Sequence, residues 1–329
     1  MKRKVIKQGH NTLTITLPSI WAKKFNLSPG KEIDMTEKDN GLFISTEKNG
    51  VEKKSEFDIT NMDIPTIWKH FMAVYREGYS EVCIKFSPKT KLESPYKFLT
   101  SHRLDRRYGK QREMRTMLSS LQEFVNRFIG FEIVEHGDNH IIVREMGDLT
   151  SKEFDNSLRK IFFLLEEMSQ NALEAIKSNN PKILEFTHDV DINLDKFHDY
   201  CIRILNKTEN KDSRKSKLLF STLYILELVG DEYKNISTHI IEDFPKCNLK
   251  NIESLADSAR EQLDVFKDLF YKFDEAKIKK ISQIDSKIYM KVPQVYKKAN
   301  EEEKEIFHHL RMIGRYINAL LELRIEMEF

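Results

Sequence analysis

Carboxylates recur at helical spacing in two stretches of the C-terminal half of the chain. Asp191, Asp195 and Asp199 are each four residues apart, so they share one face if the stretch is helical. Glu227 and Asp231 repeat the spacing further on. Like charges so placed on an exposed helix repel by roughly a few tenths of a kcal/mol per pair. Solvent, basic side chains or a bound metal ion usually offsets such repulsion.

Two Glu-x-x-His pairs offer a different chemistry. Glu185 with His188, and Glu305 with His308, have the spacing found in ferritin-like di-iron sites. Such a site also needs an inward-facing Glu on each of two other helices, and chance pairs are common in a chain this rich in Glu. There is no P-loop, no dinucleotide-binding glycine fingerprint and no nucleophile elbow. We therefore expect that the protein is not an enzyme.

The first 28 residues carry six lysines and arginines and no acidic residue. Clustered cations can neutralise DNA phosphates and release counterions. The alternative to DNA binding is that the unit only dimerises and that these lysines keep it soluble. A second basic stretch, at 89–115, could contact DNA phosphates, bind an anion or form a solvated loop; its basic residues include Arg103, Arg106, Arg107, Lys110, Arg112 and Arg115.

The composition indicates a mostly α-helical, cytoplasmic protein. The formal net charge is only +2, so nucleic-acid affinity must come from local patches. Cys83, Cys201 and Cys247 have no paired spacing, which fits a reducing compartment. No apolar run approaches the roughly 18–20 residues of a membrane span, and the basic N-terminus lacks the apolar run of a signal peptide. We expect no membrane insertion.

Three domains are expected. In residues 1–47, alternation predicts a strand at 12–17, a short helix at 19–27, and strands at 32–35 and 41–44. This unit is too small to bury a good core alone, so we expect a homodimer.

Residues 50–148 form a small α/β domain by the same reasoning, with two helices at about 64–77 and 114–129. Its strands are expected at 57–60 and 82–86 and in a hairpin over 131–134 and 140–143.

Residues 150–329 are predicted to form an antiparallel bundle of six helices in two sets of three. The expected helices span about 151–178, 181–206, 212–242, 249–278, 281–298 and 300–326. Gly230 lies inside one of them, where it would serve close helix packing.

The N-terminal unit resembles the AbrB/SpoVT swapped-hairpin family over Lys4 to Ser45. The similarity rests on Thr16-Leu17-Pro18, Trp21 and the turn from Leu27 to Lys31. Such domains interleave two chains and present basic loops to double-stranded DNA. His10 and Asn11 could read base edges, although short polar side chains in a turn more often cap the backbone. The resemblance implies these candidate DNA contacts: Lys2, Arg3, Lys4, Lys7, His10, Asn11, Lys23 and Lys24.

The helical region resembles the archaeal-type PhoU phosphate uptake regulators, and the middle domain does so around Tyr75, Gly78 and 130–135. Leu226 to Asp231 is similar to that family's Glu-x-x-x-Asp metal motif, and Asp191 to Arg203 to its paired-Asp helix. Carboxylates on two neighbouring helices can chelate Mg, Mn, Fe or Zn. The resemblance thus implies one divalent-metal site formed by Asp191, Asp195, Glu227 and Asp231.

The second set of helices departs from the motif. Its Ile-Gly core has Arg311 and Arg315 in place of the two carboxylates. We expect no metal there; the arginines could bind phosphate or a salt-bridge partner instead.

Three functions follow from these expectations. The first is a DNA-binding transcriptional regulator of phosphate uptake, or of a related metal or phosphate response. The second is an accessory protein that docks on a phosphate-transporter ATPase and does not bind DNA. The third and least favoured is a carboxylate-bridged metal enzyme.

Overall fold

The computed structural model describes residues 2–9, 11–38, 41–46, 53–89, 92–93, 114–147, 151–207, 214–243 and 246–329. The chain forms two compact units, Met1–Val51 and Glu52–Phe329. The mostly helical, multidomain fold class expected from the sequence is confirmed.

The N-terminal unit consists of two hairpins and a short helix. Strand β1 (Ile6–Gln8) pairs with β2 (Thr12–Thr14), α1 spans Ser19–Lys24, and β3 (Asp34–Lys38) pairs with β4 (Gly41–Ser45). The strand expected at 12–17 is shorter in the structure, where it ends at Thr14. No residue of this unit whose burial the structure describes is buried, and Leu13 is 70% and Ile20 79% exposed. A single copy of the unit therefore has no hydrophobic core of its own among these residues.

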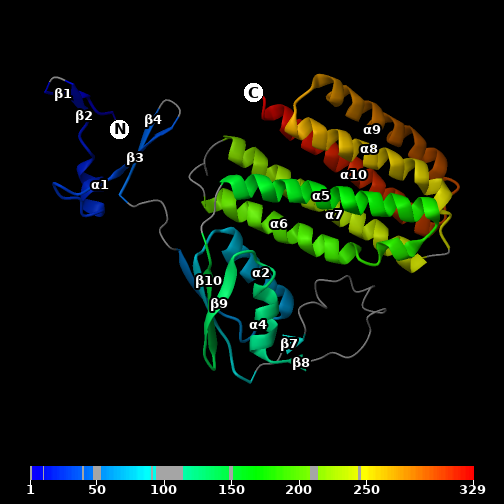
Figure 1. Cartoon of the computed structure of the whole chain (residues 1–329), viewed down its shortest axis with the longest axis horizontal. Helices are drawn as coiled ribbons and strands as arrows, with labels where there is room; N and C mark the ends of the chain where they lie inside the picture. The colour runs from blue at the N-terminus through cyan, green and yellow to red at the C-terminus, as the bar shows by residue number, and fades with distance from the viewer. Residues whose placement is uncertain are drawn as a thin grey trace. The chain divides into compact units, whose positions relative to one another are not determined.

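The expected α/β domain has one four-stranded sheet, in the order β5-β6-β10-β9. Strand β5 (Lys54–Asp58) is parallel to β6 (Glu81–Lys85), and β10 (His140–Glu145) is antiparallel to both β6 and β9 (Phe131–His136). Helices α2 (Ile64–Arg76) and α4 (Met117–Val125) belong to the same domain (Figure 1). Phe71 of α2 stacks on Phe124 of α4 with ring centroids 5.8 Å apart, and both are buried.

The basic stretch at 89–115 is only partly described. Two short strands, β7 (Leu92–Glu93) and β8 (Met114–Arg115), pair near its ends. Arg103, Arg106, Arg107, Lys110 and Arg112 lie outside the described residues, so the alternatives for this stretch stay predictions.

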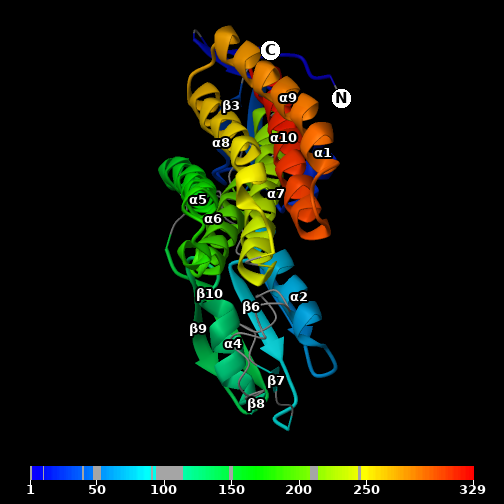
Figure 2. The same ribbon diagram turned by 90° about the vertical axis from the view of Figure 1, so that its right-hand side faces the viewer.

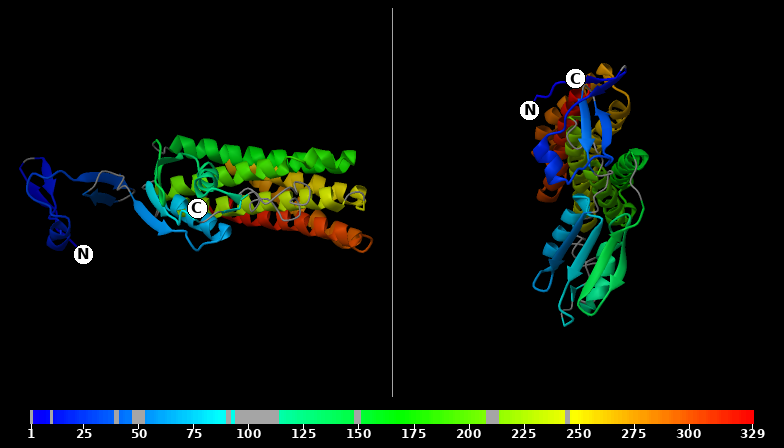
Figure 3. Two further views of the ribbon diagram at one scale, coloured as in Figure 1. Left: turned by 90° about the horizontal axis from the view of Figure 1, so that it is seen from below. Right: turned by 90° about the vertical axis from the view of Figure 1, so that its left-hand side faces the viewer.

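Six long helices form the rest of the chain, as expected: α5 (Ser151–Ser178), α6 (Thr187–Lys207), α7 (Arg214–Asp243), α8 (Leu249–Tyr271), α9 (Glu275–Tyr296) and α10 (Glu301–Glu326). Helices α5 to α7 pack together, as do α8 to α10. The two groups meet where α7 packs on α10 and α5 on α8 (Figures 2 and 3). No helix of the described residues is long and apolar enough to cross a membrane.

Two helix boundaries differ from the expectation for local reasons. A short 3-10 turn, η2 (Pro181–Leu184), precedes α6, so the helix predicted from residue 181 begins at Thr187. The break predicted near residue 280 falls earlier, because the Asp274 side chain accepts a hydrogen bond from Ala276 N and caps α9.

Gly230 serves close helix packing, as predicted. A Cβ atom at this position would lie 3.0 Å from Leu194 Cδ2 on α6 and 3.5 Å from Leu165 Cδ2 on α5. The missing side chain lets α7 approach both neighbouring helices. This approach brings the carboxylates of α6 close to those of α7.

Arg203 joins the α/β domain to the helical bundle. Its fully buried guanidinium donates hydrogen bonds from α6 to Tyr75 O at 2.6 Å and Tyr79 O at 2.8 Å. It also forms an ion pair with Glu145 at 2.9 Å. These contacts fix the α/β domain against the face of α6 that carries the carboxylates.

Candidate functional site

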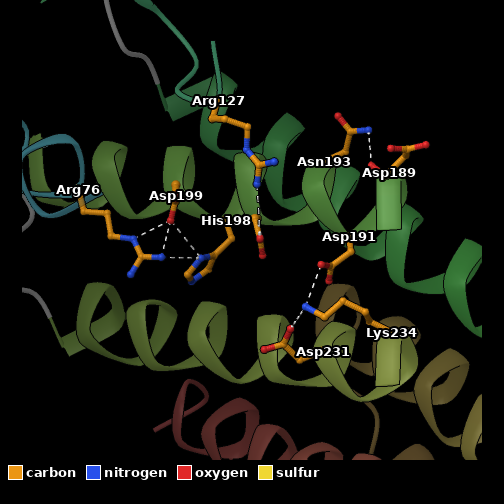
Figure 4. A network of polar contacts seen from close by, with 10 residues as sticks. Arg76, Arg127, Asp189, Asp191, Asn193, His198, Asp199, Asp231 and Lys234 are labelled. Atoms are coloured by element: carbon orange, nitrogen blue, oxygen red, sulfur yellow. Dashed lines mark hydrogen bonds and ion pairs between the residues drawn. The ribbon is translucent and has the colours of Figure 1, made fainter. Parts of the chain in front are cut away.

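Lys234 lies between the carboxylates of α6 and those of α7. Its Nζ is 2.9 Å from Oδ2 of Asp191, and it also forms a hydrogen-bonded ion pair with Asp231 (Figure 4). Asp191 is only 2% exposed. Burial raises the pKa of Asp191, whereas Lys234 lowers it. Burial disfavours the charged ammonium, but Asp191 and Asp231 together raise the pKa of Lys234, so a half-buried cation bridges the two helices.

Two arginines of the α/β domain reach the other carboxylates of α6. Arg76 of α2 pairs with Asp199 at 2.5 Å, and it also donates a hydrogen bond to the Tyr224 hydroxyl. Arg127, which follows α4, lies 3.9 Å from Asp195. The repulsion between these carboxylates was expected to be offset by solvent, basic side chains or a metal ion. The structure places basic side chains beside them.

Glu227 has no ion pair or hydrogen bond with any residue that the structure describes. Burial, and next the charge of Asp231, raise its pKa to about 7. Burial and the neighbouring Asp191 likewise raise the pKa of Asp195 well above its usual value.

The cluster contains more carboxylates than cations. It contains five carboxylates (Asp191, Asp195, Asp199, Glu227 and Asp231) and three cations (Arg76, Arg127 and Lys234). Two protons or one divalent cation would balance the difference.

The oxygen donors of these side chains suit a hard divalent cation, but no three of them bring their ligand atoms within 4.8 Å of one another in the structure. All four ligands expected from the sequence offer carboxylate oxygens, and Asp191 Oδ1 has no hydrogen-bond partner among the described residues. Lys234 lies where such an ion would bridge Asp191 and Asp231, so binding would require its ammonium to move aside. Metal binding by Asp191, Asp195, Glu227 and Asp231 stays a prediction.

Replacing Glu227 with Gln should change how stability depends on pH. The folded protein keeps the Glu227 proton up to about pH 7, whereas the unfolded chain loses it near 4.5. The free energy of unfolding of the native protein therefore falls as pH rises through this window. Since Gln cannot ionise, Glu227→Gln should gain about 1–3 kcal/mol over the native protein between pH 4.5 and pH 8.

Urea unfolding of both proteins at several pH values, with a chelator present, measures this gain. His188 acts in the opposite sense, because burial and Lys234 lower its pKa to about 4. Its titration is common to both proteins and cancels in the difference. A difference in stability that is constant with pH would show that Glu227 titrates normally.

The two Glu-x-x-His pairs do not line one interior site. His188 is buried, and neither ring nitrogen has a hydrogen-bond partner among the described residues. Glu185, Glu305 and His308 are exposed. Arg311 and Arg315, expected to hold no metal, are exposed on α10.

The candidate DNA contacts are exposed wherever the structure describes them. The exposed candidates are Lys2, Arg3, Lys4, Lys7, Asn11, Lys23 and Lys24. Trp21 and Ala22, which precede Lys23, are half-buried. His10 lies outside the described residues. Exposed cations on a unit without acidic residues at 1–28 are free to meet a polyanion.

Comparisons with known proteins find a family model that matches the N-terminal part of the chain and solved structures that are similar to about half of it. A family model described as antidote-toxin recognition MazE, bacterial antitoxin, matches residues 6–52, which confirms the expected AbrB-type domain at the N-terminus. No curated protein matches the chain.

Two solved structures are similar to about half of the chain. PhoU from Pseudomonas aeruginosa is 15% identical, with a TM-score of 0.47, and covers 53% of this chain and 94% of its own. The phosphate transport system regulatory protein PhoU from Streptococcus pneumoniae is 18% identical, with a TM-score of 0.46, and covers 54% and 95%.

Sequence reasoning missed the cations of the cluster. Lys234 could have been predicted from the sequence, since it follows Asp231 by three residues and Glu227 by seven and so shares their helix face. Arg76 and Arg127 gave no such signal, because they belong to another domain; Arg76 and Asp199 are 123 residues apart in the sequence.

Proposed function

We propose that the protein is a homodimeric DNA-binding regulator of phosphate uptake or of a related metal or phosphate response. The observation that carries the proposal is the N-terminal unit: it matches the MazE family model, it is basic and free of acids over residues 1–28, and none of its residues whose burial the structure describes is buried. The first two features suit a DNA-binding surface, and the third calls for a second copy to complete the core.

The helical unit is proposed to sense the signal. Its carboxylate cluster contains two more carboxylates than cations and couples α6 and α7 to the arginines of the α/β domain. A divalent cation that binds there would change the ion pairs that hold the α/β domain. The phosphate connection rests on the resemblance of Leu226–Asp231 and Asp191–Arg203 to the PhoU motifs.

Removal of the N-terminal unit should abolish dimerisation. The intact chain is expected to be a dimer, because pairing would cover Leu13, Ile20, Met35 and Leu42, which are 62–79% exposed in one copy. A truncated chain of residues 53–329 should be a monomer, since it keeps its own core. Light scattering at several concentrations measures both masses. Equally tight dimers of the two proteins would place the interface in the larger unit.

Replacing Lys2, Arg3, Lys4 and Lys7 together by Ala should weaken duplex DNA binding by at least about tenfold at low salt, because fewer phosphates are then neutralised and fewer counterions are released. Fluorescence anisotropy on fragments of the organism's own promoters measures the affinity. The matched control replaces four exposed lysines in or directly after α9 (Lys279, Lys287, Lys291 and Lys297) by Ala and should bind like the native protein.

Equal affinity of the native protein and the N-terminal variant would remove these residues from the interface. Failure of the native protein to bind any duplex would favour the accessory protein that docks on a transporter ATPase.

A further inference from the structure

A second group of possible metal ligands lies where α7 packs on α10. His239 of α7 and Glu305 and His309 of α10 each offer one ligand atom, and these atoms all lie within 4.8 Å of one another. Glu305 and His309 are four residues apart and so share a helix face. Among the residues that the structure describes, no other group of three such side chains meets this condition.

A carboxylate lies near each of the two histidines, and the one beside His309 is hydrogen-bonded to it. His309 Nδ1 lies 2.5 Å from Glu232 Oε2, and since a carboxylate only accepts, this nitrogen donates. The lone pair of His309 is therefore on Nε2. His239 Nδ1 lies 3.6 Å from Asp243 Oδ2, which is beyond hydrogen-bond distance. Metal-binding histidines usually donate a hydrogen bond to an outer carboxylate, as His309 does, which fixes the ring and makes it a better ligand.

The two histidines are largely buried, whereas Glu305 is open to solvent. The side chains of His239 and His309 are 13% and 14% exposed, and their ring centroids are 5.3 Å apart. Glu305 is exposed. An ordinary packing role, the ion pair of His309 with Glu232, accounts for one histidine but not for the convergence of His239 and Glu305 on it.

We propose that His239, Glu305 and His309 bind a zinc ion, with Glu232 as the residue that positions His309. Two imidazoles and one carboxylate form a ligand set typical of Zn²⁺ sites that keep a fourth position open. Mg²⁺ and Ca²⁺ prefer oxygen ligands, so this site and the carboxylate cluster differ in the metal they select.

The zinc ion would join the two three-helix groups, because His239 belongs to the first and the other two ligands belong to the second. A ligand that binds only the folded arrangement stabilises it by mass action. Zinc should therefore raise the melting temperature of the protein through the α7–α10 contact.

The test is isothermal titration of the chelated full-length chain with ZnCl₂ in excess MgCl₂, which saturates sites built of oxygen ligands alone. We expect one tight zinc site per chain. Glu305→Gln, whose side chain is exposed and so should not disturb folding, should weaken it at least tenfold. Glu232→Gln should weaken it about 10- to 100-fold. His239→Gln with His309→Gln should remove it.

The matched control is His308→Gln, which changes the exposed neighbouring histidine and should bind zinc like the native protein. Retention of the site in Glu227→Ala with Asp231→Ala would separate it from the carboxylate cluster. The proposal fails if the native chain binds no zinc under these conditions, or if Glu305→Gln and the double His variant bind it as tightly as His308→Gln does.

Discussion

Lys234→Met should destabilise the metal-free larger unit by about 3–5 kcal/mol at pH 8, because it leaves Asp191 buried without its cation. Asp191 is 2% exposed, and the Lys234 ammonium is its ion-pair partner at 2.9 Å. The loss should shrink as pH falls, because burial raises the pKa of Asp191 and a proton on its carboxyl removes the unpaired charge. Urea unfolding with a chelator present measures the free energy of unfolding.

Two further variants separate charge from packing. Asp191→Asn combined with Lys234→Met should recover much of the loss, since no buried charge then remains unpaired. Lys177→Met is the matched control, because Lys177 forms an exposed ion pair with Asp257, and it should change stability little. A loss for Lys234→Met no larger than that of Lys177→Met would show that the cluster is an ordinary solvated face.

Metal should reverse part of the loss in Lys234→Met. Once the ammonium is gone, Mg²⁺ or Mn²⁺ can take its place between Asp191 and Asp231, and melting temperature should rise on addition of either ion. Adding Glu227→Ala and Asp231→Ala to Lys234→Met should abolish that rise. If metal still raises the melting temperature, Glu227 and Asp231 are not its ligands.

Arg203→Met should cost about 3–5 kcal/mol, the range for breaking a buried charged contact. The Arg203 guanidinium supplies hydrogen bonds to two backbone carbonyls and one carboxylate, and its carbon Cζ lies 4.8 Å from the centroid of the Tyr75 ring. Methionine fills part of the space but donates nothing, so the carbonyl oxygens of Tyr75 and Tyr79 lose this donor. Lys207 still pairs with Glu145, which limits the damage there.

Arg144→Met is the matched control for Arg203. Arg144 makes two hydrogen bonds to Glu81, but its side chain is 53% exposed, and its loss should change the midpoint of urea unfolding little. If the two arginine variants unfold at the same urea concentration, the buried guanidinium does not hold the α/β domain to the bundle.

The helical architecture was largely readable from the sequence because long amphipathic stripes are local signals. The bounds of α5 agree with the pattern, and those of α7 and α10 do so within two residues. The boundary between α8 and α9 was misplaced because it depends on one cap, Asp274, within a run of polar residues that also suits a helix.

Only part of the carboxylate cluster could be predicted from the sequence. Spacing placed Asp191 and Asp195 on one face and Glu227 and Asp231 on another, and the structure brings these faces together. The arginines that neutralise them come from the α/β domain, and His239 meets Glu305 across a helix pair far apart in the sequence. Periodicity within one helix says nothing about which face of another helix it will meet.

The salt dependence of DNA affinity tests the central claim most directly. We expect the logarithm of the association constant of the full-length protein for a promoter duplex to fall linearly with the logarithm of salt concentration. The Lys2, Arg3, Lys4 and Lys7 to Ala variant should give a shallower slope, by ~0.9 for each phosphate that the variant no longer neutralises, and the chain of residues 53–329 should bind no duplex. An equally steep slope for all three proteins would contradict the assignment of DNA binding to the N-terminal unit.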